Sequence, residues 1–158
     1  MHGTRIITVS AALLALAAIV SAQRPYPRRG GAGAMRSQPQ ISVTLSLDHA
    51  VYSAASSTAI TAQLTARNTT PDAVTLTQPT TQTYDLEIRD AKGKVVYLWS
   101  GGKFFGQVVT SVNFTAELDY TITAPLPNLE PGQYVAQAWL TVSGPQRAYS
   151  ASVGFEIR

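Results

Sequence analysis

Apolar and polar residues alternate along much of the chain after residue 40. The alternation is clearest in Ile41–Leu47, in Thr58–Arg67 and in Ala116–Ile122. Successive side chains of a strand point to opposite faces, so a period of two predicts strands with one buried face. Short runs rich in β-branched and aromatic residues predict further strands at Tyr84–Ile88, Val95–Trp99, Val108–Phe114, Tyr134–Val142 and Ala148–Ile157, with another beginning at Val74.

Turn residues separate these runs at nearly regular intervals, and no helical period follows residue 40. About eight short strands with this spacing predict an all-β fold, an immunoglobulin-like antiparallel β-sandwich of about 7–9 strands. The segment Leu129–Tyr134, with the sequence LEPGQY, predicts a turn that leads into a late strand. A tyrosine in that position can donate its hydroxyl to backbone across a corner of the sandwich.

The strongest local signal is a hairpin centred on Asp90–Gly93, between two apolar runs. The Asp90 side chain can bond backbone two residues further on, and Gly93 can adopt a positive φ. Tyr84–Ile88 and Val95–Trp99 are therefore expected to pair as antiparallel strands.

The sequence leaves the register of this hairpin open. If Gly93 closes a type I turn with a bulge, Ile88 pairs with Val96, and Tyr97 and Trp99 lie on the polar face. If the loop is one residue longer, Leu86 pairs with Tyr97, and the faces are exchanged. The position of the glycine favours the first register, in which the two rings need a cover or a partner. Burial of both rings is the outcome expected from the ordinary behaviour of large aromatic residues.

The chain of 158 residues is expected to hold one folded domain. Residues 1–22 resemble a secretory signal peptide, because Arg5 precedes the apolar run Ile6–Val20 and small residues follow it. Residues 23–39 are rich in Pro, Gly and Arg and predict a flexible basic tether. The sandwich is expected to span residues 40–158. These features predict a secreted or periplasmic protein that meets the membrane only transiently, through its signal peptide.

Charge and cysteine content narrow the function. The chain contains no Cys, so its core alone must hold the domain, and Cys nucleophiles and Cys-based metal sites are excluded. The formal net charge is +3, but five of the 12 basic residues precede residue 40. The predicted domain holds the remaining seven basic residues and all nine acidic residues, so its net charge is −2. A nucleic-acid partner is not expected, because such domains carry positive charge on a folded face.

No constellation of catalytic residues is apparent. His49 is the one His outside the predicted signal peptide, and no Gly-x-Ser-x-Gly motif occurs. Asp85 and Glu87 are expected to share one strand face with Arg89, as a solvated ladder of charges rather than a pair of catalytic carboxylates. We therefore expect no catalytic residues, no metal, no cofactor and no enzymatic activity.

From about Gln40 to the C-terminus, the sequence resembles the BsuPI family of intracellular proteinase inhibitors. The segments that carry the resemblance are Asn68–Val74 with Gln82 and Tyr84–Asp85, then Arg89–Val96, Trp99–Gln107 and Leu129–Tyr134. The resemblance implies an immunoglobulin-like sandwich and a protein partner, a serine protease. Because the chain also carries a predicted export signal, that protease is expected outside the cytoplasm.

Two non-enzymatic functions are compatible with these features. In both, the protein is expected to be a monomer. In the first, the loop Ser100–Phe105 inhibits a protease, with Lys103 or Phe104 in its specificity pocket and Phe105 beside them. The glycines at 101 and 102 argue against this loop, because ordering a flexible segment costs entropy. In the second, a cell-envelope module binds a protein or polysaccharide through outward-facing Tyr97 and Trp99, or serves as an accessory structural domain.

Overall fold

The computed structural model describes residues 40–126 and 129–158. These residues form ten β-strands and no helix. The strands are β1 (Ile41–Leu47), β2 (Val51–Tyr52), β3 (Ala59–Asn68), β4 (Val74–Gln78), β5 (Tyr84–Asp90), β6 (Val95–Leu98), β7 (Thr110–Phe114), β8 (Glu117–Pro125), β9 (Gly132–Leu140) and β10 (Ser150–Ile157). The additional short strand is β2, which lies within a predicted loop and pairs in parallel with the end of β10.

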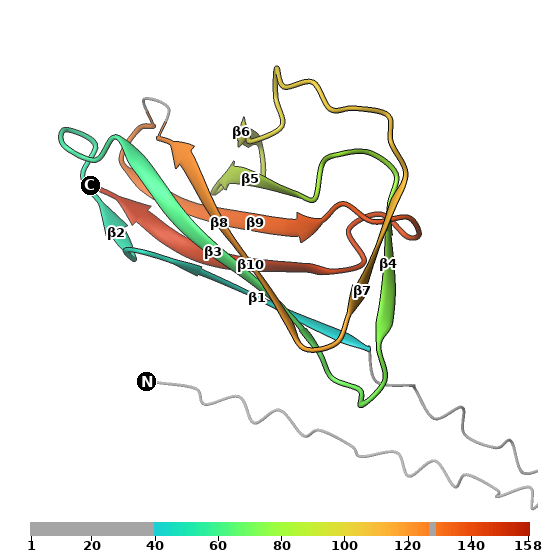
Figure 1. The fold of residues 1–158 in the computed structure, drawn as a ribbon. Coiled ribbons are helices and arrows are strands. Elements are labelled where there is room, and N and C mark those ends of the chain that lie inside the picture. Colours follow the sequence, from blue (N-terminus) through green and yellow to red (C-terminus); the bar gives the residue numbers. More distant parts are fainter. Residues whose placement is uncertain (1–39, 127–128) are drawn as a thin grey trace, which may run out of the picture. The chain divides into compact units, whose positions relative to one another are not determined.

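The strands form two facing sheets and a separate ribbon. One sheet has the order β1-β3-β8, the other has the order β2-β10-β9-β5-β6, and β4 pairs with β7. In Figure 1 the sheet that holds β3 and β8 lies over the sheet that holds β9 and β10. Apart from the β2–β10 pair, all pairings are antiparallel. The predicted all-β, immunoglobulin-like antiparallel sandwich is therefore confirmed.

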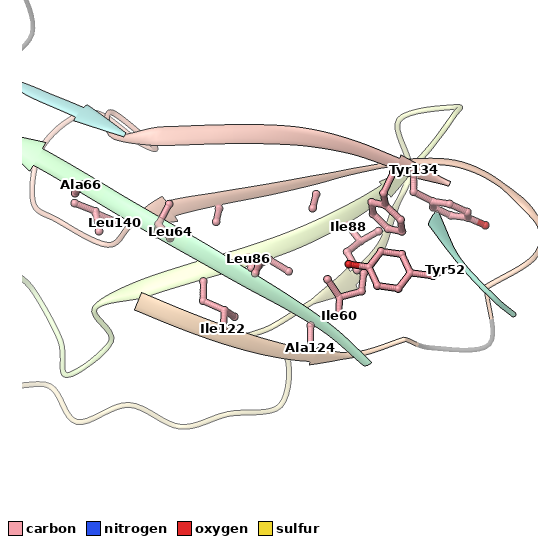
Figure 2. Close-up of a cluster of buried hydrophobic side chains, with 14 of the residues drawn as sticks. Tyr52, Ile60, Leu64, Ala66, Leu86, Ile88, Ile122, Ala124, Tyr134 and Leu140 are labelled. Carbon is pink, nitrogen blue, oxygen red and sulfur yellow. The ribbon is translucent and has the colours of Figure 1, made fainter. Parts of the chain in front are cut away.

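The core lies between the two sheets, as Figure 2 shows. The alternation in β3 buries Ile60, Ala62, Leu64 and Ala66 and turns the residues between them outward. The facing side chains come mainly from β5, β9 and β10, and they include Leu86, Ile88, Tyr134, Ala136, Ala138, Leu140, Phe155 and Ile157. Burial of each large apolar side chain contributes about 1.5–3 kcal/mol, which allows a chain without Cys to hold this fold.

The ribbon of β4 and β7 connects the two sheets. Along the chain, β4 lies between β3 of one sheet and β5 of the other, and β7 lies between β6 and β8. Leu76 from β4 and Phe114 from β7 are both buried in the common core. The ribbon therefore closes one side of the sandwich and fixes where the segment between β6 and β7 must end.

Tyr134 forms the predicted corner at the start of β9. Its hydroxyl donates a hydrogen bond of 2.8 Å to the backbone carbonyl of Glu130, four residues upstream. Its ring is buried and stacks on Phe155 with a centroid separation of 5.6 Å. Burial raises the pKa of the Tyr134 hydroxyl, so it remains a donor across the physiological range.

The hairpin of β5 and β6 follows the first predicted register only near its turn. Arg89 pairs with Val95 there, but Ile88 pairs with Tyr97, because an irregularity in the ladder shifts the register by one residue. Beyond that shift, Tyr97 and Trp99 lie on the face of Ile88 and pack against the core. The preference for the first register was therefore wrong for the aromatic residues, and the pairing of Ile88 with Tyr97 differs from both predicted registers. Both rings pack against the core but are half-buried, which is less than the burial that was expected.

The predicted signal peptide and the predicted tether, residues 1–22 and 23–39, lie outside the described residues. Within the part of the chain that the structure describes, no helix is long and apolar enough to cross a membrane.

Candidate functional site

The loop that follows β6 is held at its start by Asp85 of β5. The Asp85 carboxylate accepts hydrogen bonds from the Ser100 amide at 3.1 Å and from the Ser100 hydroxyl at 2.6 Å. It also accepts one from the Leu86 amide at 2.9 Å, and Asp85 is only 7% exposed. Hydrogen bonds to an ionised carboxylate are stronger than neutral ones. Asp85 therefore fixes the point where the chain leaves the sheet.

Two glycines in this loop are required by its geometry. The Gly101 amide donates to the Leu98 carbonyl at 3.0 Å, and a Cβ at position 101 would lie 2.9 Å from that same oxygen. Gly102 has a φ of 75°, in the region that other residues rarely adopt. The Lys103 amide then donates to the Ser100 carbonyl at 3.0 Å. The glycines thus form a defined turn that backbone hydrogen bonds order before any partner binds, which reduces the expected entropy cost of ordering this loop.

Two side chains of the loop, Lys103 and Phe105, contact the Trp99 ring. The Lys103 ammonium lies 3.1 Å from the centroid of the Trp99 ring. The Phe105 ring stacks against Trp99 with a centroid separation of 6.1 Å, and Tyr84 of β5 contacts it at 4.7 Å. A cation–π contact at an exposed site contributes about 0.5–1 kcal/mol, and an aromatic pair about 0.5–1.5 kcal/mol. Desolvation lowers the pKa of Lys103, and the nearby charge of Asp85 opposes this effect.

The far end of the loop is bonded to the segment before β5. The Gly106 amide donates to the Thr81 hydroxyl at 2.9 Å, and the Thr81 amide donates to the Gly106 carbonyl at 2.9 Å. This pair of bonds joins residues 25 positions apart. The segment Ser100–Gly106, which we call the presented loop, is therefore anchored at both ends and at its centre.

Phe104 projects from the presented loop without any cover, and it is 100% exposed. Its neighbours Lys103 and Phe105 are both turned toward Trp99. Of the seven large exposed hydrophobic side chains in the described residues, five lie close together in sequence, between positions 95 and 109, namely Val95, Leu98, Phe104, Val108 and Val109. This concentration of exposed apolar residues in one segment makes the segment a candidate contact region.

The structure gives the five candidate contact residues different environments. Phe104 is fully exposed, whereas Lys103 and Phe105, its neighbours in the sequence, contact the Trp99 ring. Tyr97 and Trp99 are half-buried and pack on the core, so each ring is only partly exposed. Burial raises the pKa of the Tyr97 hydroxyl, and the nearby Asp85 carboxylate adds to that effect.

The prediction of a solvated ladder at Asp85, Glu87 and Arg89 is wrong. Glu87 is only 2% exposed, and it pairs with Arg89 at 2.6 Å and with Arg147 at 2.8 Å. Arg147 also lies over the Trp139 ring at 4.0 Å. Burial alone would raise the pKa of Glu87, but the hydrogen bonds from the two arginines hold it below its usual value. The alternating pattern gave no sign that the β9–β10 loop covers this face with Arg147.

Sequence reasoning also missed two residues that shape the presented loop. The sequence predicts Asp85 only as one charge of an exposed ladder, and it indicates no role for Thr81. Both act on residues more than ten positions away, and only the folded chain brings them together.

Two depressions lie elsewhere on the sandwich. One depression of about 260 Å³ is lined by Ser42, Thr44, Thr65 and Arg67 on the outer face of β1 and β3. Another, of about 150 Å³, lies between the hairpin turn and the start of β9. Neither includes a residue of the presented loop, and no cluster of three or more potential metal ligands occurs in residues 40–126 and 129–158. The candidate site is the presented loop, in which Phe104 is fully exposed.

The described residues thus form an immunoglobulin-like sandwich with one loop that is anchored at both ends. The sequence profile of the BsuPI family, described as intracellular proteinase inhibitors, matches residues 45–145. The match covers more than half of the chain and includes the whole presented loop. The chain belongs to this family, which confirms the resemblance seen in the sequence.

Solved structures resemble this chain only distantly. They include the sporulation control protein Spo0M from Bacillus subtilis, with 12% identity, a TM-score of 0.46 and coverage of 75% of this chain and 49% of that one. The alkylpurine DNA glycosylase AlkC from Pseudomonas fluorescens has 17% identity, a TM-score of 0.45 and coverage of 75% and 30%. The CARDB domain of PF1109 from Pyrococcus furiosus has 13% identity, a TM-score of 0.42 and coverage of 76% and 89%. None of the curated proteins is similar enough in sequence to count as a relative.

The family description corrects one prediction. Its members are intracellular proteinase inhibitors, so the secreted or periplasmic location predicted for this chain is wrong, and the description points to the cytoplasm. The prediction was based on an apolar run that follows a single arginine, and such composition alone does not determine export.

Proposed function

We propose that this protein inhibits a serine protease by inserting the presented loop into the active-site cleft, without catalysing a reaction itself. The observation that carries the proposal is the family match over residues 45–145, because it spans the sandwich and the loop together. The family description implies a protease partner in general. The choice of the serine class and of this loop is our own.

The geometry of the loop supports inhibition. Tight inhibitors bury about 800 Å² per partner, and their affinity depends on loops that are already ordered before binding. Here Asp85, Trp99 and Thr81 hold the loop through hydrogen bonds and ring contacts. Little conformational entropy then remains to be lost when a protease binds.

The same contacts count against a module that binds a polysaccharide through its aromatic residues. Sugar rings stack on open aromatic faces, but the Trp99 ring is in contact with Lys103, Phe105 and Tyr84. Tyr97 is also packed against the core. Both rings are half-buried and engaged by neighbouring side chains, which favours the presented loop over the aromatic pair as the contact surface.

A titration of the full chain against purified proteases tests the proposal. The panel contains a subtilisin-like, a chymotrypsin-like and a trypsin-like enzyme, and residual activity is measured with small chromogenic peptides. Stoichiometric inhibition of at least one enzyme is expected. Full activity of every enzyme at micromolar concentrations of the chain would overturn the proposal.

A double variant assigns the inhibition to the loop. Changing Lys103 and Phe104 together to Ala should abolish inhibition, because it removes the projecting ring and one of its supports. Lys92→Ala is the matched control, since Lys92 is an exposed lysine in the turn of the neighbouring hairpin. Unchanged inhibition by the double variant would remove the assignment to this loop.

A further inference from the structure

The peptide bond between Phe104 and Phe105 lies at the most exposed point of the presented loop. Phe104 has no cover at all, while Phe105 stacks on Trp99. On the other side of Phe104, Lys103 lies over the same Trp99 ring. The fully exposed Phe104 thus lies between two residues, Lys103 and Phe105, that both contact Trp99.

We infer that Phe104 is the residue that enters the specificity pocket, and that the Phe104–Phe105 bond is presented to the catalytic serine of the protease. The inference depends on the proposed inhibitory function and specifies its chemistry. A fully exposed phenylalanine fits a large apolar pocket, as in chymotrypsin-like or subtilisin-like enzymes. An acidic pocket of the trypsin type would require Lys103, whose ammonium is engaged with Trp99.

The backbone around this bond suits a protease cleft. Residues 103–109 belong to no strand of the described structure, so their backbone is not part of a sheet ladder. Peptide substrates commonly bind as an added strand, through main-chain hydrogen bonds and pockets for alternate side chains. The exposed Val108 and Val109 extend the apolar surface on the C-terminal side of the bond.

The contacts also explain why the loop would inhibit the protease instead of being consumed. Hydrolysis adds water across the bond: the C–N bond breaks, Phe104 gains a carboxylate and Phe105 gains an ammonium group. Before water arrives, the acyl group of Phe104 is bound to the serine, and the free amine of Phe105 can attack it and restore the peptide bond. The peptide bond re-forms faster than the acyl group is hydrolysed if the amine of Phe105 stays close to it.

Several contacts keep that amine in place in a chain that has no disulfide. Phe105 remains stacked on Trp99, and Gly106 remains bonded to Thr81 through both of its backbone groups. On the acyl side, Lys103 remains on Trp99, and β6 remains paired with β5. A reacting group held near its partner has a very high effective concentration, so resynthesis competes with hydrolysis.

Cleavage mapping tests the bond directly. The full chain is incubated with chymotrypsin at equimolar and at catalytic ratios, and the products are identified by intact mass. We expect slow accumulation of the fragments 1–104 and 105–158, which remain associated under native conditions and separate in denaturant. Tight inhibition with first cleavage at another bond, or with no cut at this bond, would overturn the inference.

Substitutions at Phe104 test the pocket. Phe104→Ala should raise the inhibition constant against chymotrypsin about 30-fold or more, the loss typical of a central anchor. Phe104→Lys should lose inhibition of chymotrypsin and gain inhibition of trypsin. Val135→Ala is the control, because Val135 is an exposed apolar residue of β9, outside the presented loop, at 42% exposure. Since both side chains are exposed, these variants are expected to fold normally.

Phe105→Ala distinguishes the fit of Phe104 in the specificity pocket from the role of Phe105 in holding the released amine near the acyl group. It leaves Phe104 in place but removes the stack on Trp99, so the chain should be cleaved about tenfold faster, as for a poorly retained leaving group. Its unfolding in urea is measured alongside. Slower cleavage, or a cleavage rate unchanged in a folded variant, would contradict the retention argument.

The outcomes separate this inference from the proposed function. If the unmodified chain inhibits no protease, the proposed function fails. If the unmodified chain inhibits chymotrypsin and Phe104→Ala inhibits it equally well, the function stands and only the assignment of Phe104 fails.

Discussion

Tyr134 joins a turn to a strand through one hydroxyl group. The side chain leaves β9, and its hydroxyl donates to the carbonyl of Glu130 at 2.8 Å, while the ring packs on Phe155. Tyr134→Phe keeps the ring and removes this bond. We expect a loss of about 1 kcal/mol in the free energy of unfolding, the usual net worth of one hydrogen bond, measured by urea denaturation.

Tyr149→Phe is the matched control for the corner. Tyr149 is half-buried against the same core, but its hydroxyl makes no hydrogen bond with the described residues. This change should alter the free energy of unfolding by less than about 0.5 kcal/mol. Equal losses in the two variants would mean that the corner bond adds nothing specific.

Glu87 is a buried carboxylate whose charge is balanced by Arg89 and Arg147. Glu87→Gln would leave both guanidinium groups without their anion. Breaking a buried pair usually costs about 3–5 kcal/mol, and we expect a loss of about 3 kcal/mol, because the arginines remain partly solvated. Urea denaturation at neutral pH measures this loss.

The control for Glu87 is an exposed pair of the same chemistry. Glu117 accepts from Arg67 at 2.8 Å on the outer face of the other sheet, where both side chains meet solvent. Glu117→Gln should cost no more than about 1 kcal/mol, as exposed ion pairs do. A loss as large as that of Glu87→Gln would show that burial is not what makes the Glu87 cluster important.

At the scale of elements, the presented loop depends on a contact between two connections. Thr81 and Gly106 exchange two hydrogen bonds, one through the Thr81 hydroxyl and one through its amide. Thr81→Val keeps the shape of the side chain and removes the acceptor of the Gly106 amide. We expect hydrogen exchange of that amide to accelerate about tenfold, equivalent to about 1.4 kcal/mol of local stability, with little change in global unfolding.

Thr123→Val provides the comparison. Thr123 is an exposed threonine of β8 whose hydroxyl makes no hydrogen bond within the described residues. Its substitution should leave exchange at Gly106 unchanged. If Thr81→Val also leaves that exchange unchanged, the loop is held by the Trp99 contacts and not by Thr81.

The β5–β6 hairpin shows how far local sequence determines an element. The turn at Asp90–Gly93 was predictable, because Asp90 accepts from the Lys92 and Lys94 amides and Gly93 has a φ of 79°. The shift in the ladder was not, because it turns Trp99 toward Tyr84, which in turn contacts Tyr120 of β8. Contacts with a distant strand decide this register, and no local pattern encodes them.

The candidate site was predictable to the same extent. The break after Trp99 located the loop and its three candidates, Lys103, Phe104 and Phe105. Which of the three points outward depends on the Trp99 ring, whose own direction follows from the shifted register. The turn chemistry was therefore visible in the sequence, but the direction of each side chain was a property of the packed sandwich.

At the scale of the whole molecule, acidic groups couple the fold to pH. In Asp48, burial would raise the pKa, but hydrogen bonds from Tyr52, the Thr61 amide and His49 together lower it. The pKa of Glu87 is lowered by hydrogen bonds from its two arginines, although burial alone would raise it. The pKa of Glu156 is lowered by a hydrogen bond from Arg158. All three carboxyl groups therefore hold their protons less tightly in the folded chain than in the unfolded chain.

The sign of the pH dependence follows from this difference. Above the ordinary pKa values, 3.8 for Asp and 4.5 for Glu, both states are ionised and the full stabilisation is present. As the pH falls below these values, the unfolded chain binds protons first, so the free energy of unfolding decreases until the folded groups are protonated too. Urea denaturation from about pH 7 to about pH 3 should show a plateau followed by a decline. The decline should be shallower in Glu87→Gln, because that variant lacks the most buried of the three groups, and an equally steep decline would place the acid sensitivity elsewhere in the fold.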